Sequence, residues 1–121
     1  MPRPRAAAVA FYRDMQRDLP THPGRWPNSL GRSTDVQRVV NRLVSDRACV
    51  PLRGTIQRYQ CDEYPFAATA EGAASGPRGV NWDVRLMPNT HNQRVGGLLS
   101  AFYQDQRMFM GVDRFYVDIV P

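Results

Sequence analysis

Side chains with oxygen and nitrogen donors gather in the second half of the chain, where they could hold a cation or activate water. Asp62 and Glu63 are adjacent, Glu71 follows on a predicted loop, and His91 and Asn92 begin a predicted helix. Hydrolysis of a phosphodiester needs a base for water, a cation near the phosphate, and groups that hold the polyanion. Oxygen ligands favour Mg²⁺ or Mn²⁺, with Ca²⁺ as an alternative.

Each of these positions also has a purely structural interpretation. Asp62-Glu63 fits an ordinary polar turn, Asn92 fits a helix cap, and His91 fits a surface histidine. In an extended segment Asp62 and Glu63 point to opposite faces, so we expect them to have different roles. The sequence contains no zinc-site spacing, phosphate-binding glycine loop or serine-nucleophile elbow, and no spacing alone decides the chemistry.

All of the basic charge comes from arginine, since the 121 residues include 16 arginines and no lysine. Residues 1–60 hold 11 arginines against four aspartates, whereas residues 61–121 hold five arginines against seven acidic residues. Because arginine suits phosphate, this asymmetry fits a polyanion clamp beside a cation site. An arginine-rich genome and an ordinary solvated surface explain the same counts.

Individual arginines are predicted to contact a nucleic-acid backbone. Arg94 falls in the first turn of a predicted helix, where backbone N–H groups favour an anion. Arg58 and Arg85 lie on extended segments beside the oxygen donors and are predicted as further contacts. Three more arginines on another predicted helix face either phosphate or solvent: Arg38, Arg42 and Arg47.

Three helices are predicted to position these residues. Residues 6–18 form the first, which ends at Leu19-Pro20. Ser33 or Thr34 caps the second, whose apolar residues recur at helical spacing as one buried stripe. The members of that stripe are Val36, Val39, Val40, Leu43 and Val44.

The third predicted helix runs from about His91 to Met108. Gly96-Gly97 weaken it by roughly 1 kcal/mol each, so close packing or a ligand is expected to explain these small residues. Residues 55–60 are predicted to be extended, while residues 80–86 and 115–120 alternate as strands. The resulting order predicts an α+β fold: a small antiparallel sheet with packed helices.

Cys49 and Cys61 are an even pair in a small chain, which favours one disulfide over two buried thiols. That bond would contribute roughly 3 kcal/mol to stability. The sequence contains no apolar run of about 18 residues, so no membrane helix is predicted. The apolar run in the basic opening is too short for a signal peptide, so we interpret these residues as mature chain and expect any true signal to lie upstream.

The residues around Asp62 resemble a known family signature. The run Cys61-Asp62-Glu63-Tyr64-Pro65-Phe66-Ala67-Ala68-Thr69, followed by Glu71-Gly72, is similar to that of the NucA/NucB-type extracellular deoxyribonucleases. The resemblance covers about residues 41–120 and includes Asn92 and Gly96-Gly97. It implies a secreted, metal-dependent, sequence-nonspecific endonuclease with a core like that of the ββα-metal nucleases.

The resemblance also implies site residues. Carried over by position, Asp62 is the general base, Asn92 is a metal ligand and Glu63 is a supporting carboxylate. Residues 93–104 contain no acid where a ββα-metal helix usually carries a glutamate. The substitutes that we expect are Gln104, Asp105 and Glu71, with His91 as a further candidate catalytic residue.

The resemblance divides the chain into an N-terminal helical extension, residues 1–40, and a nuclease domain, residues 41–121, within one compact unit. The expected substrate is DNA, with RNA as an alternative, and the expected state is a monomer without membrane contact. An inhibitor or immunity protein is a candidate partner. Two other functions fit the sequence: a nuclease toxin domain of a larger secreted protein, and a catalytically inactive nucleic-acid-binding module.

Overall fold

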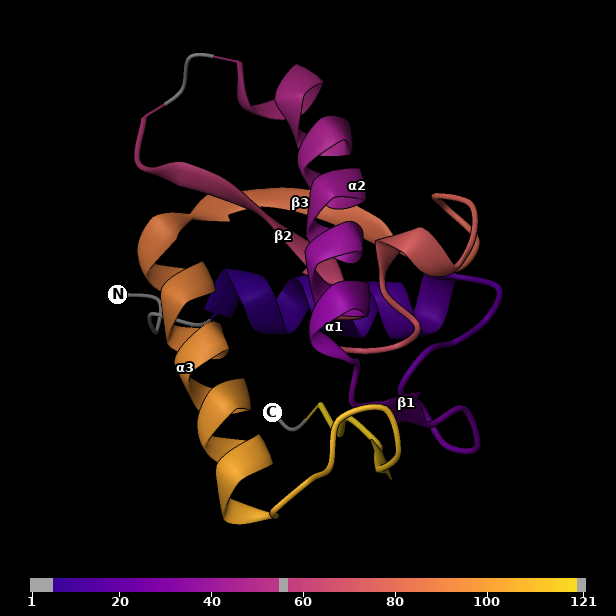
Figure 1. Ribbon diagram of the computed structural model, residues 1–121. Coiled ribbons are helices and arrows are strands. Elements are labelled where there is room, and N and C mark those ends of the chain that lie inside the picture. Colours follow the sequence, from indigo (N-terminus) through magenta and orange to yellow (C-terminus); the bar gives the residue numbers. More distant parts are fainter. Residues whose placement is uncertain (1–5, 55–56, 120–121) are drawn as a thin grey trace.

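The computed structural model describes residues 6–54 and 57–119 of the chain (Figure 1). Within these residues, helices and two small antiparallel sheets make the predicted α+β fold. In chain order the elements are α1 (Ala6–Asp18), β1 (Leu30–Gly31), α2 (Asp35–Arg53), β2 (Tyr59–Tyr64), the 3-10 helix η1 (Ala73–Ser75), β3 (Asp83–Pro88), α3 (Asn89–Asp105) and β4 (Arg114–Phe115).

Helix α1 has the bounds that the sequence predicts and buries one side. Phe11, Tyr12 and Met15 are buried, while Val9 is half-buried. The buried side chains join one hydrophobic cluster with residues of β1, β2, β3, α3 and β4. The first helix therefore contributes to the main core of the molecule.

Helix α2 begins at a capping box, which confirms the predicted start. The Thr34 side chain accepts a hydrogen bond from the Gln37 amide at 3.1 Å, and the Gln37 side chain accepts one from the Thr34 amide at 2.9 Å. These two bonds satisfy amide groups that the first turn of a helix leaves unpaired.

The buried apolar stripe predicted for α2 is wrong. The side of α2 that faces the protein is polar and contains Asn41, Ser45 and Cys49. Of the predicted stripe, Val44 is half-buried, and the exposed fractions of the others are 74% for Val36, 54% for Val39, 42% for Val40 and 58% for Leu43.

The physical reason is the loop after β2, whose backbone needs hydrogen-bond partners. The Asn41 amide donates to the carbonyl oxygens of Ala67 and Thr69, both at 2.9 Å, and its oxygen accepts from the Ala74 amide at 2.9 Å. A Cβ at Gly72 would lie 2.4 Å from Asn41 Nδ2, so the loop packs directly on this side chain. Hydrophobic spacing cannot reveal such a polar contact.

Strands β2 and β3 form an antiparallel ribbon in which Asp62 is opposite Arg85 and Glu63 is opposite Val84. The ribbon lies between α1 and α2, and α3 runs beside it (Figure 1). Both strands begin later than predicted, because residues 80–82 precede β3 and β2 starts at Tyr59. The predicted start of β2 at residues 55–56 lies outside the described residues.

The remaining elements follow the predicted order, with two corrections. Helix α3 begins two residues earlier than expected and ends at Asp105. The final strand predicted at residues 115–120 is wrong over most of its length, because only Arg114–Phe115 pair, with Leu30–Gly31 of β1. Residue 120 lies outside the described part.

A disulfide joins Cys49 of α2 to Cys61 of β2, as predicted. It fixes the end of α2 to the strand that carries Asp62 and Glu63. The helices of the described ranges include none that is long and apolar enough to span a membrane.

Candidate active site

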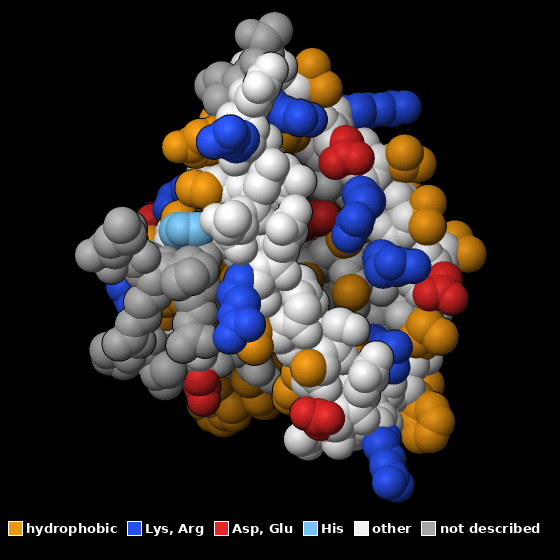
Figure 2. All heavy atoms as spheres, turned by 90° about the vertical axis from the view of Figure 1, so that its left-hand side faces the viewer, with side chains coloured by type: hydrophobic (Ala, Val, Ile, Leu, Met, Phe, Trp, Pro, Cys, Tyr) orange, Lys and Arg blue, Asp and Glu red, His pale blue; other side chains and the backbone are white. Residues whose placement is uncertain are grey.

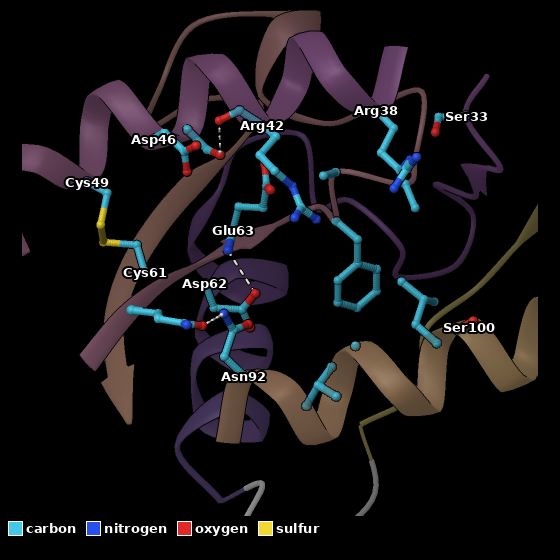
Figure 3. A pocket seen from close by; sticks show the side chains of 18 of the residues that line it. Ser33, Arg38, Arg42, Asp46, Cys49, Cys61, Asp62, Glu63, Asn92 and Ser100 are labelled. Carbon is cyan, nitrogen blue, oxygen red and sulfur yellow. Dashed lines mark hydrogen bonds between the residues drawn. A yellow bond between two sulfur atoms is a disulfide. The ribbon is translucent and has the colours of Figure 1, made fainter. Parts of the chain in front are cut away.

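A cavity of about 700 Å³ opens between α2, β2 and α3, beside the loop that follows β2. Asp62 and Glu63 lie at its floor, one wall is a side of α2, and the other is a side of α3 (Figure 3). From outside, basic side chains gather along one margin of this hollow and an acidic side chain lies deep within it (Figure 2). We call this cavity the cleft.

Asp62 is buried at the floor, with 7% of its surface exposed. Its Oδ1 accepts a hydrogen bond from the Glu63 amide at 2.9 Å, and its Oδ2 accepts one from the Tyr12 hydroxyl. Burial raises the pKa of Asp62 to about 6, although both hydrogen bonds oppose this rise. A carboxylate whose pKa lies near neutral pH is suited to accept a proton.

Glu63 lies on the other face of β2, which confirms that the two acids point apart. Burial raises the pKa of Glu63 to about 7, while Ser45 and Arg42 of α2 oppose the rise. Its Oε2 is buried and has no hydrogen-bond partner among the described residues. An orphaned carboxylate oxygen is costly unless another group binds it.

The α2 wall carries most of the charge around the cleft. Arg38, Arg42 and Arg53 line it, together with two aspartates, Asp35 and Asp46. Arg38 and Arg42 reach from the helix toward the cavity (Figure 3). Arg38 forms an exposed ion pair with Asp35 at 3.8 Å, which leaves most of its charge available to a ligand.

The α3 wall is uncharged where it lines the cleft. Asn92 lies at its start, and its side chain donates to Gln60 Oε1 at 2.9 Å. Gly96 lies further along, where a Cβ would meet no atom within 4 Å. Packing among the described residues therefore does not explain this helical glycine. The other lining residues of this wall are Val95, Leu99, Ser100 and Tyr103.

Several sequence-predicted residues lie outside the cleft. His91 Nδ1 accepts a hydrogen bond from the Ala7 amide at 3.2 Å. Glu71 accepts from the Gly31 amide at 2.6 Å and pairs with Arg114 at 3.0 Å, at a second cavity. Gln104 and Asp105 are exposed at the end of α3. Of the predicted catalytic and metal-binding residues, Asp62, Glu63 and Asn92 therefore line the cleft, whereas His91, Glu71, Gln104 and Asp105 do not.

The predicted nucleic-acid contacts Arg58, Arg85 and Arg94 also lie outside the lining of the cleft. Arg85 pairs with Asp14 at 2.9 Å and lies over the Phe11 ring at 5.1 Å, whereas Arg58 and Arg94 are exposed.

Sequence reasoning missed Tyr12, Arg32 and Arg53 as lining residues. A signal for Arg53 was present. If Cys49 is bridged to Cys61, the side of α2 that carries Cys49 faces the strand of Asp62, and residues four and seven positions away share that side. Arg53 and Arg42 stand at those positions.

The donor set of the cleft is compatible with a hard divalent cation. Among the described residues, no three histidine, cysteine, aspartate or glutamate side chains form a cluster that could hold a metal. Magnesium, however, commonly takes one or two carboxylates and keeps several water ligands. The cleft offers a carboxylate oxygen without a partner, on Glu63, and an amide oxygen, on Asn92.

Comparisons with known proteins give one match. No curated protein and no solved structure matches the chain. The family model described as deoxyribonuclease NucA/NucB matches residues 31–118, which include α2, β2, β3 and α3 but not α1. The matched region thus holds both walls and the floor of the cleft. The chain belongs to the deoxyribonuclease NucA/NucB family and is an enzyme that hydrolyses DNA.

Proposed function

We propose that the cleft cleaves the DNA backbone with water activated by Asp62. The observation that carries this proposal is a buried carboxylate at the floor of a cleft whose wall bears arginines. Two hydrogen bonds fix the orientation of Asp62, so the carboxylate can receive a proton from water without first reorganising.

The arginines of α2 hold the substrate in this proposal. Arg38 and Arg42 contact phosphate oxygens, and Arg53 extends the same side of the helix. Contacts to phosphate carry no base information, so cleavage has low sequence specificity. RNA offers the same phosphates, and a comparison of both substrates decides whether the enzyme also cuts RNA.

Asn92 is the residue that would hold a divalent cation, with water completing its ligands and with Glu63 nearby as an unpartnered buried carboxylate. When bound, the cation supplies positive charge that stabilises the leaving oxygen. Glu63 is thereby a supporting carboxylate, since it faces α2 while Asp62 faces α1. Secretion is part of the proposal as well, because the family and the disulfide both fit an extracellular location.

The test compares Asp62→Asn with Asp83→Asn in a plasmid digestion with Mg²⁺ or Mn²⁺, with and without chelator. Asp83 is a matched control, since its Oδ1 also accepts from the next amide, at 2.8 Å, but it lies outside the cleft. Asp62→Asn should lose about 10²- to 10⁴-fold in rate, while Asp83→Asn stays near wild type. Equal rates for the two variants would refute the base assignment, and full activity in chelator would refute the metal requirement.

A further inference from the structure

The first helix reaches the active site from outside the region that the family shares. The family match begins at residue 31, whereas α1 ends at Asp18. From this helix, the Tyr12 hydroxyl donates a hydrogen bond to Asp62 Oδ2. Both side chains are buried, with 4% of Tyr12 and 7% of Asp62 exposed.

The Tyr12 ring is itself fixed by the aromatic residues that follow Asp62. Its centroid lies 5.2 Å from that of Tyr64 and 5.1 Å from that of Phe66, the latter in an edge-to-face arrangement. Such pairs favour a defined ring orientation. The hydroxyl is thus held at one place relative to the end of β2.

Two parts of the chain orient the Asp62 carboxylate, each through one hydrogen bond. The Glu63 amide holds Oδ1 and belongs to the same strand, so it fixes the group only locally. Tyr12 holds Oδ2 from 50 residues away. Without the hydroxyl, rotation about the Cβ–Cγ bond would be limited by one hydrogen bond instead of two.

We propose that Tyr12 is a positioning residue of the active site, and that α1 completes the catalytic floor in this chain. The inference rests on the proposed role of Asp62 as the base that activates water. Tyr12 keeps its proton, because burial and the neighbouring Asp62 raise its pKa well above the ordinary value. It therefore acts as a hydrogen-bond donor that aims the carboxylate, and it does not itself exchange protons.

Tyr64 offers a matched control for the loss of a buried hydroxyl. Its ring belongs to the same aromatic group, and it is fully buried. Its hydroxyl donates to the Pro23 carbonyl at 2.7 Å and accepts from Gln16 Nε2 at 3.0 Å. Tyr64→Phe thus removes an equivalent group without changing the contacts of Asp62.

The experiment measures kcat and KM on a duplex DNA, and the melting temperature, for Tyr12→Phe, Tyr64→Phe and Asp62→Asn. Both phenylalanine variants should lose stability to a similar extent. Tyr12→Phe should lose about 10- to 100-fold in kcat with KM changed less than about twofold, because the base is misplaced and the DNA contacts are kept. Tyr64→Phe should keep its kcat.

If Tyr12→Phe and Tyr64→Phe have equal kcat values while Asp62→Asn is inactive, the proposed role of Tyr12 is overturned. The assignment of Asp62 as the base would then still hold. An active Asp62→Asn would instead overturn the proposed function, and the role of Tyr12 with it. If Tyr12→Phe fails to fold, Tyr12→His replaces it, since its ring keeps an N–H donor. A folded Tyr12→His with at least a tenth of the wild-type kcat supports the proposal, and an inactive one overturns it.

Discussion

The two walls of the cleft differ in charge and in attachment. The α2 wall carries arginines and is joined to the floor by the disulfide between Cys49 and Cys61. The α3 wall is uncharged, includes a glycine that packing does not require, and contacts the floor through the hydrogen bond from Asn92 to Gln60. Under the proposed function, DNA is held by charge on one side of the cleft and approached closely on the other.

The largest expected effect comes from detaching the charged wall. Replacing both cysteines by serine should lower the free energy of unfolding by roughly 3 kcal/mol, as expected for a loop of this length. The end of the charged wall that carries Arg53 should also lose its fixed position, so kcat/KM should fall in the protein that remains folded. Urea unfolding and the digestion assay measure the two effects, and unchanged values in both would show that the bond does not anchor this wall.

The floor should make stability depend on pH. Because the pKa of Asp62 is raised to about 6 and that of Glu63 to about 7, the folded protein binds these protons more tightly than the unfolded chain. This stabilisation is present below about pH 4 and is lost as the pH rises through 6 and 7. In chelator, Asp62→Asn should therefore be more stable than wild type at pH 8, on the order of 2 kcal/mol.

Asp83→Asn again provides the control for that measurement, since its carboxylate lies partly exposed beside Arg78. It should not gain stability at pH 8. A melting temperature of Asp62→Asn that is below that of wild type at pH 8 would contradict the expected cost of burying the charge.

Removing charge from the α2 wall should weaken DNA binding with little effect on the chemical step. The double variant Arg38→Ala/Arg42→Ala should raise KM by about tenfold. It should also release about two fewer counterions on binding DNA, which is measured as a smaller slope of the logarithm of the binding constant against the logarithm of the salt concentration. Arg47→Ala is the control on the same helix, because Arg47 does not line the cleft. An equal change in KM for the control would mean that charge anywhere on α2 suffices.

Filling the α3 wall should separate stability from activity. Gly96→Ala and Gly97→Ala should each stabilise the helix by about 1 kcal/mol, since neither added Cβ meets a neighbour. Only Gly96 lines the cleft, so only its substitution should raise KM, by a few-fold and without a change in salt dependence. If both variants keep the wild-type KM, the DNA does not approach this part of α3.

Local patterns in the sequence predicted much of the frame. The bounds of α1, the Thr34 cap, and the opposite faces of Asp62 and Glu63 follow from propensities and spacing, which act over a few residues. The disulfide follows from an even pair of cysteines in a small chain. The family signature predicted the floor, since Asp62 and Glu63 are contiguous in the sequence.

Contacts between distant segments could not be predicted in this way. The burial of Asn41 depends on the backbone of a loop about 30 residues away, so the apolar spacing of α2 indicated the wrong face. Tyr12 meets Asp62 across 50 residues, and nothing near either residue predicts the contact. Arg38 and Arg42 were ambiguous because a solvated arginine and a phosphate-binding arginine have the same local pattern.

The exposed valines and leucines of α2 affect how the enzyme behaves in solution. An apolar strip on the outside of a protein favours self-association and adsorption to nonpolar materials, and the net charge of +5 opposes both through mutual repulsion. As the salt concentration rises, the distance over which this repulsion acts becomes shorter. Added salt should therefore weaken DNA binding by the arginines and also promote self-association of the enzyme. A concentrated protein stock is best kept at low salt concentration.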